Sequence, residues 1–70
     1  MPEQCLIYVN GKEEAVVCGS SVSDLLSLLG YPAKMVLVEL NKEVLPRGDW
    51  ATRRLESRDR VEILRVVAGG

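Results

Sequence analysis

The chain has 70 residues and a formal net charge of −1, from nine basic and ten acidic side chains. This length makes one domain at most, and such a domain buries only about 60% of the surface that its unfolded chain exposes. Apolar residues make up 47% of the sequence, enough for a core and too much for a disordered chain. No apolar run approaches the roughly 20 residues of a membrane span. The acidic balance argues against nucleic-acid binding.

The sequence contains no histidine and only two cysteines, Cys5 and Cys18. These residues cannot complete a four-ligand zinc site within one chain. Ser-His and Cys-His nucleophilic catalysis by this chain alone is also excluded. We therefore expect a protein that is not an enzyme and that binds no metal or cofactor of its own. The N-terminal residues 1–4 (MPEQ) are acidic rather than basic, and no signal-peptide pattern follows them, which favours a cytoplasmic location.

The first predicted element is a β-hairpin. Residues 5–9 (CLIYV) are rich in β-forming side chains and lead into Asn10-Gly11, a strong hairpin signal. Residues 15–18 then form the return strand, so the chain is expected to fold back on itself within its first quarter.

The register of this hairpin is predicted from side-chain matching. A two-residue turn would place two charged residues on the apolar face of the first strand. A three-residue loop of residues 10–12, with a glycine bulge, instead sets Ala15 opposite Ile7. In that register Cys5 and Cys18 point to opposite faces, so we expect no disulfide between them.

A short amphipathic helix is expected next. Ser21 and Asp24 form a capping-box-like start, and Gly30 suits the C-terminal stop. The residues between them place an apolar side chain at each helical repeat. The members of this stripe are Val22, Leu25, Leu26 and Leu29.

Two further strands complete the predicted elements. Residues 35–40 (MVLVEL) form a nearly continuous apolar run, which indicates a strand buried on much of both faces. Residues 44–50 are irregular because a proline and a glycine interrupt any period. Residues 60–67 (RVEILRVV) form the last strand. Trp50, the only tryptophan, is expected to pack over the open end of the sheet.

These elements make an α+β fold, in which one helix packs across a mixed four- to five-stranded sheet. The β-grasp (ubiquitin-like) arrangement is the economical way to join them. It places the final strand beside the first, in the middle of the sheet. We expect one β-grasp domain over residues 1–67 and a flexible Gly-Gly tail over residues 68–70.

The most informative feature is the C-terminal pair Gly69-Gly70. Glycine makes up about 7% of residues, so the pair arises by chance in roughly 0.5% of chains, although inert glycine-rich ends also occur. A tail of Ala68, Gly69 and Gly70 can thread a narrow channel in a partner, because glycine has no Cβ. The Gly70 carboxylate is a poor electrophile, but its mixed anhydride with AMP can react with a sulfur nucleophile to give a thiocarboxylate.

Three further features resemble the thiamine-biosynthesis sulfur carrier family. They are the hairpin Val9-Asn10-Gly11, the element Pro46-Arg47-x-x-Trp50, and the segment 59–63 (DRVEI) that runs into the Gly-Gly end. Other carriers share the Gly-Gly end, so the Pro-Arg-x-x-Trp element discriminates better. The resemblance covers essentially the whole chain, apart from a longer N-terminus of residues 1–4.

The resemblance implies a sulfur carrier whose Gly70 is adenylated by an E1-like enzyme with ATP and magnesium. It also implies a sulfur donor such as a cysteine desulfurase and delivery of the sulfur to thiazole synthase. A carrier for molybdopterin or another sulfur pathway, and a ubiquitin-like modifier or interaction module, are the alternatives. We expect partners to contact Arg47 and the exposed face of the last strand, at Leu64, Arg65 and Val66. Neither nucleic acid nor a membrane is expected as a partner.

Overall fold

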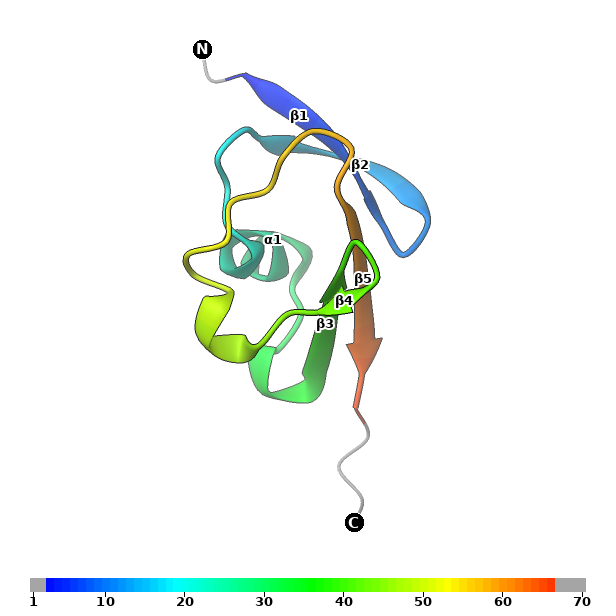
Figure 1. Cartoon of the computed structure of the whole chain (residues 1–70), viewed down its shortest axis with the longest axis vertical. Coiled ribbons are helices and arrows are strands. Elements are labelled where there is room, and N and C mark those ends of the chain that lie inside the picture. Colours follow the sequence, from blue (N-terminus) through cyan, green and yellow to red (C-terminus); the bar gives the residue numbers. More distant parts are fainter. Residues whose placement is uncertain (1–2, 67–70) are drawn as a thin grey trace.

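The computed structural model describes residues 3–66, which form five strands and one α-helix (Figure 1). The strands are β1 (Gln4–Val9), β2 (Lys12–Val17), β3 (Val36–Leu40), β4 (Glu43–Val44) and β5 (Arg60–Arg65). The helix α1 spans Val22–Leu29, and short 3-10 helices span Ala33–Met35 and Arg47–Asp49. No helix in this part of the chain is long and apolar enough to cross a membrane.

The strand β5 lies in the middle of the sheet and joins its two halves. The strand order is β2-β1-β5-β3-β4. The β5 strand runs parallel to β1, where Tyr8 pairs with Arg60, and antiparallel to β3, where Leu40 pairs with Val61. The helix crosses one face of this sheet (Figure 1). The predicted β-grasp fold, with the last strand beside the first, is therefore confirmed.

The helix α1 begins and ends where the sequence predicts. The Ser21 hydroxyl accepts a hydrogen bond from the backbone N–H of Asp24, and the Asp24 carboxylate accepts one from the backbone N–H of Ser21, both at 3.0 Å. This capping box satisfies two N–H groups that the helix leaves unpaired. Gly30 ends the helix with a φ of 77°, in the left-handed region that glycine adopts without a steric penalty.

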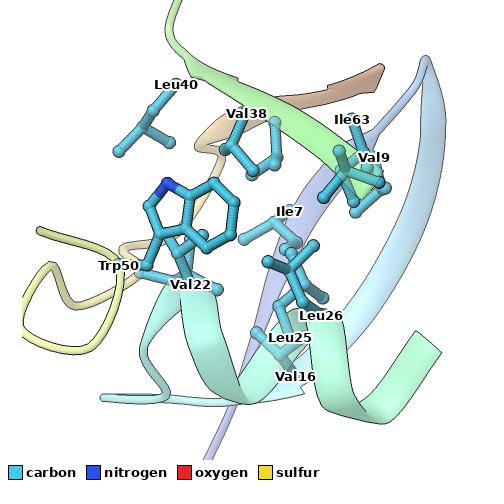
Figure 2. Packing of buried hydrophobic residues seen from close by; sticks show 13 residues of the cluster. Ile7, Val9, Val16, Val22, Leu25, Leu26, Val38, Leu40, Trp50 and Ile63 are labelled. Carbon is cyan, nitrogen blue, oxygen red and sulfur yellow. The ribbon is translucent and has the colours of Figure 1, made fainter. Parts of the chain in front are cut away.

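The hydrophobic core lies between α1 and the inner face of the sheet (Figure 2). Trp50 closes it and is only 4% exposed. Its indole N–H donates a hydrogen bond to the Leu45 carbonyl at 2.9 Å, which satisfies the one polar group of the buried ring. The predicted packing of Trp50 is thus confirmed. The core residues are Ile7, Val9, Val16, Val22, Leu25, Leu26, Val36, Val38, Leu40, Trp50, Leu55, Val61 and Ile63.

The strand β3 is buried on one face only, so the prediction that it would be buried on both was wrong. Val36, Val38 and Leu40 are buried against the core, whereas Leu37 is exposed and Glu39 is partly exposed. The reason is that α1 covers a single face of the sheet (Figure 1). The apolar run of residues 35–40 therefore places Leu37 on the outer face of the sheet.

The β1–β2 hairpin has a different register from the one predicted. Val9 pairs with Lys12, which leaves a turn of only two residues, Asn10 and Gly11. Both turn residues have positive φ angles, 50° and 83°. This combination defines a tight turn whose twist matches that of the flanking strands. The chemistry of the turn therefore determines the register, and the three-residue loop was a wrong prediction.

The observed register places Lys12 and Glu14 on the inner face, as a two-residue turn requires. The hairpin accepts these charges because its tip borders a cavity of about 410 Å³ instead of the closed core. Lys12 is exposed there and Glu14 partly so. Ala15 pairs with Leu6 and not, as predicted, with Ile7.

The same shift of one residue overturns the prediction that the two cysteines are not bridged. Cys5 pairs with Val16, so Cys18, two positions further on, lies diagonally across from Cys5 on the same face. Their Cα atoms are 5.1 Å apart, and the two sulfurs form a disulfide. A slip of one residue moves every side chain of a strand to the opposite face. The wrong register therefore led directly to the wrong pairing.

Candidate functional site

The candidate site is the C-terminal end of β5 together with the chain that follows it. Beyond Arg65, the backbone N–H of Val66 donates to the Met35 carbonyl at 2.8 Å, which ties the strand end to the 3-10 helix before β3. The tail residues Ala68, Gly69 and Gly70 lie outside the described residues, as does the domain boundary predicted at residue 67. The flexible tail therefore stays a prediction.

Apolar side chains are exposed on the outer face of the sheet beside this strand end. Leu37 and Leu64 pair directly across β3 and β5, and each leaves 45% of its surface exposed. Val66, two residues after Leu64, is also exposed, and the alternation of an extended chain places it on the same face. We call Leu37, Leu64 and Val66 the outer patch. The sequence predicted two of its members but missed Leu37, because β3 was expected to be buried on both faces.

Arg65 does not belong to the outer patch, although it was predicted from the sequence to lie there with Leu64 and Val66. Adjacent residues of a strand point to opposite faces. The Arg65 guanidinium carbon accordingly lies 5.8 Å from the ring centroid of Tyr31, just beyond α1, and Arg65 lines the same cavity as Lys12. The strand end thus has an apolar outer side and a charged inner side.

Arg47 makes contacts within the domain. Its guanidinium donates hydrogen bonds to the backbone carbonyls of Ala33 and Val36, the latter at 3.0 Å, and lies over the Trp50 ring, 5.1 Å from its centroid. These contacts join the segment before β3 to the segment after β4. Within the domain, the Pro46-Arg47-x-x-Trp50 element therefore links these two segments through Arg47. A contact of Arg47 with a partner stays a prediction.

Asp59 fixes the start of β5. Its carboxylate is nearly buried, with 7% of the residue exposed. It accepts hydrogen bonds from the Glu56 backbone N–H at 2.8 Å and the Asn41 side-chain amide at 3.1 Å, and pairs with Arg53 at 3.5 Å. A buried carboxylate needs such partners to offset its loss of hydration. The segment that resembles the carrier family thus anchors the strand that leads into the tail.

Asn10 has a second role that was not predicted from the sequence. Its side-chain oxygen accepts a hydrogen bond from the Ile63 backbone N–H at 2.8 Å, and its own backbone N–H donates to the Val61 carbonyl at 2.9 Å. Asn10 therefore continues the pairing of β5 past the point where β1 ends. The turn residue that sets the hairpin register also holds the strand that carries the tail.

No group of three or more potential metal ligands converges within residues 3–66. In the same part of the chain, no fully buried side-chain nitrogen or oxygen atom lacks a hydrogen-bond partner. The reactive group suggested by the sequence is the Gly70 carboxylate, which lies outside the described residues.

The fold, the outer patch and the Gly-Gly end together define a small ubiquitin-like β-grasp protein of the carrier type. Residues 6–70 match the ThiS family, and the chain belongs to this family. Among solved structures it is similar to a thiamine biosynthesis protein (ThiS) from Geobacter metallireducens. The TM-score is 0.81 and the identity 38%, over 93% of this chain and 99% of that one.

Similar curated proteins fall into two groups by length. The sulfur carrier protein ThiS of Escherichia coli strain K12 is 28% identical over 64 residues, which cover 91% of this chain and 97% of that protein. A thiazole synthase of Magnetococcus marinus is 33% identical over 64 residues, and one of Paramagnetospirillum magneticum is 31% identical over 64 residues. The chain spans only 20% of the length of each of these synthases.

Proposed function

We propose that this chain is a sulfur carrier of thiamine biosynthesis and that Gly70 is the residue that carries the sulfur. The observation that carries the proposal is the match to the ThiS family, which runs through residue 70 and so includes the Gly-Gly pair. The similarity to the sulfur carrier of Escherichia coli over nearly the full length of both chains supports it.

The proposed reaction uses the chain as a co-substrate. An E1-like enzyme joins the Gly70 carboxylate to the AMP part of ATP, and pyrophosphate leaves. A sulfur nucleophile then attacks the activated carbonyl and displaces AMP. Sulfide gives the thiocarboxylate directly. The persulfide of a donor such as a cysteine desulfurase gives an acyl disulfide, and two thiols then reduce its S–S bond to release the thiocarboxylate and are themselves oxidised to a disulfide. No step needs an acid or base from this chain, which accords with a sequence that contains no histidine.

The outer patch is the proposed docking surface for the activating enzyme. Leu37, Leu64 and Val66 expose apolar surface on the strand pair that leads into the tail. Four residues follow Val66, so the Gly70 carboxylate can reach roughly 13 Å beyond it when extended. A partner that covers the patch can thus hold the carboxylate in an active site while it binds the folded domain.

Thiazole synthase is the proposed acceptor of the sulfur. In two thiazole synthases, a segment similar to this chain is part of a longer polypeptide. Joining two proteins in one chain raises their effective concentration, which is useful when one must repeatedly meet the other. That arrangement supports a functional pairing between a domain of this kind and the synthase.

The test is the intact mass of the chain after incubation with ATP, a sulfur source and a ThiS-activating enzyme. Replacement of one oxygen by sulfur is the expected result, and a variant that lacks Gly69-Gly70 is the control. A covalent adduct with a protein lysine would identify a modifier instead. An unchanged mass, with an enzyme that loads a known carrier in parallel, would overturn the proposal.

A further inference from the structure

The disulfide between Cys5 and Cys18 has no part in the proposed sulfur transfer. We propose that it is a redox-controlled site, opened by dithiol reductants, that sets the stability of the folded domain and leaves the chemistry of the tail unchanged. The proposal concerns the open end of the β1–β2 hairpin, which lies at the opposite end of the sheet from the end of β5, and its first test does not depend on the function of the protein.

The disulfide closes the open end of the hairpin. Cys5 lies in β1, and Cys18 directly follows the last residue of β2. At the other end, β1 and β2 are joined by the Asn10-Gly11 turn. Residues 5–18 therefore form a covalent ring around the whole hairpin. The backbone N–H of Cys18 also donates a hydrogen bond to the Glu3 carbonyl at 2.8 Å, so backbone pairing between the two sides of the hairpin continues beside the disulfide.

The strand β2 needs this support because it is an edge strand with few core contacts. It pairs with β1 alone. Val16 is its one buried residue, Glu14 is partly exposed, and the other four residues are exposed. A two-stranded hairpin is marginally stable by itself in water. Without the disulfide, the outer strand is held by its backbone ladder and by the burial of one valine.

A reductant can reach the bridge from solvent. Both cysteines are only partly buried, and their sequence neighbours Gln4, Val17 and Gly19 are exposed. A thiolate of a dithiol reductant attacks one sulfur of the disulfide, and the other sulfur leaves as a thiolate and takes up a proton. The second thiol of the reductant then resolves the mixed disulfide. The protein gains two thiols, and the reductant is oxidised to a disulfide.

Opening the ring has a large effect in so small a domain. A disulfide that closes a loop of about 15 residues restricts the unfolded chain enough to change the unfolding equilibrium constant about 100-fold. A chain of 70 residues has a small core and a correspondingly small reserve of stability. The redox state of the pair thus determines how much of the protein is unfolded, and so exposed to proteases, at a given temperature.

The chemistry of the tail is remote from the bridge. The strands β1 and β5 are parallel, and Tyr8 pairs with Arg60. Cys5 lies three positions before Tyr8, and Arg65 lies five positions after Arg60. At about 3.3 Å per residue, the bridge and the end of β5 are about 26 Å apart along the sheet. Figure 1 shows this separation, with the start of β1 and the end of β5 at opposite ends of the molecule.

The first experiment compares urea unfolding of the full chain before and after treatment with dithiothreitol, with the mass of alkylated protein reporting the thiols. Reduction should raise the unfolding equilibrium constant about 100-fold. The Cys5→Ala, Cys18→Ala double variant should match the reduced protein and should not respond to dithiothreitol. Two alkylatable thiols in folded protein prepared without reductant, or reduction with no change in the unfolding midpoint, would overturn the proposal.

The second experiment separates stability from sulfur transfer, and it alone depends on the proposed function. The double variant and the oxidised wild type are loaded with sulfur at a temperature where both are folded. Equal initial rates, within about twofold, are expected because the bridge lies far from the tail. Loss of loading in the folded variant, with the wild type active, would show that the cysteines act in the transfer and would overturn the separation of roles.

Discussion

Leu37 and Leu64 face each other across the β3–β5 pair, and each leaves 45% of its surface exposed on the outer face of the sheet. Directly opposed apolar side chains stabilise a sheet, but this pair retains surface that no described part of the chain covers. An exposed apolar patch is typical of a binding site. Since β5 leads into the tail, a partner on this pair also lies beside the strand from which the tail extends.

The first prediction concerns Leu64. Replacement by Asp should raise the KM for the carrier in adenylation about tenfold or more, which corresponds to ~1.4 kcal/mol of docking energy. The unfolding midpoint should change little, because the side chain lies outside the core. Leu28→Asp is the matched control, since Leu28 is 68% exposed but lies on α1, on the other side of the sheet. Equal effects of the two substitutions on KM would contradict the docking surface.

The second prediction concerns the packing of α1 on the sheet. Leu26 is 2% exposed, and Leu26→Ala should lower the free energy of unfolding by about 2–4 kcal/mol, because it removes buried methyl groups and leaves a cavity. Leu28→Ala, on the exposed side of the same helix, should change it by less than about 0.5 kcal/mol. Urea unfolding of both variants is the measurement. Similar losses in both would mean that the buried stripe of the helix is wrongly assigned.

The third prediction separates the two possible roles of Arg47. Its hydrogen bonds to Ala33 and Val36 and its contact with Trp50 predict that Arg47→Ala lowers the free energy of unfolding by roughly 1–3 kcal/mol. Arg47→Lys should restore only part of this, because an ammonium group lacks the planar set of donors. Unfolding and adenylation kinetics are measured on each variant. A raised KM with unchanged stability would show that Arg47 acts on the partner.

The fourth prediction concerns pH and Asp24. The hydrogen bond from the Ser21 backbone, followed by that from its side chain, lowers the pKa of Asp24 below its ordinary value of 3.8. A lowered folded-state pKa stabilises the protein above the unfolded-state pKa, and this stability is lost as the pH falls through the folded-state pKa. Asp24→Asn should therefore be less stable than the wild type at pH 7, and the difference should shrink below about pH 4. A difference that is constant from pH 7 to pH 3 would exclude this contribution of the carboxylate.

The helix α1 was predicted correctly from the sequence, whereas the register of the β1–β2 hairpin was not. The helix was predicted correctly because Ser21, Asp24 and Gly30 each act on the backbone within one turn, so local chemistry determines the result. The register of β2 is set by the two-residue Asn10-Gly11 turn. The prediction instead gave more weight to matching apolar side chains, although the inner face near this turn borders a cavity that accepts charged residues. The error of one residue then propagated to the disulfide between Cys5 and Cys18.

Only part of the candidate site was predicted correctly from the sequence. The exposure of Leu64 was predicted correctly, because alternation gives the face of a strand. Gly69 and Gly70 lie outside the described residues, so their role stays a prediction. Arg65 was assigned to the wrong face, although the same alternation separates it from Leu64. Leu37 was missed because the exposure of β3 depends on the helix covering only one side of the sheet.

The last prediction is that Gly70 must be the terminal residue and that Gly69 must stay small. Adenylation needs the carboxylate in line with the α-phosphate of ATP, and an error of about 1 Å in such geometry already slows a reaction steeply. An added residue moves the carboxylate by more than 3 Å, since each extended residue spans about 3.3–3.6 Å. Gly69→Val places a branched side chain where a narrow channel accepts only backbone.

Neither change should affect the fold, because residues 67–70 follow the last strand and the core cluster is built from residues 7–63. We therefore expect both variants to unfold like the wild type and to remain unloaded. The measurement is the intact mass of the wild type, a C-terminally extended form and Gly69→Val after reaction with ATP, a sulfur source and the activating enzyme. Gly69→Ala is the graded control and should load more slowly than the wild type but faster than Gly69→Val. If the extended form gains sulfur as fast as the wild type with its added residue still attached, the Gly70 carboxylate is not the group that carries the sulfur.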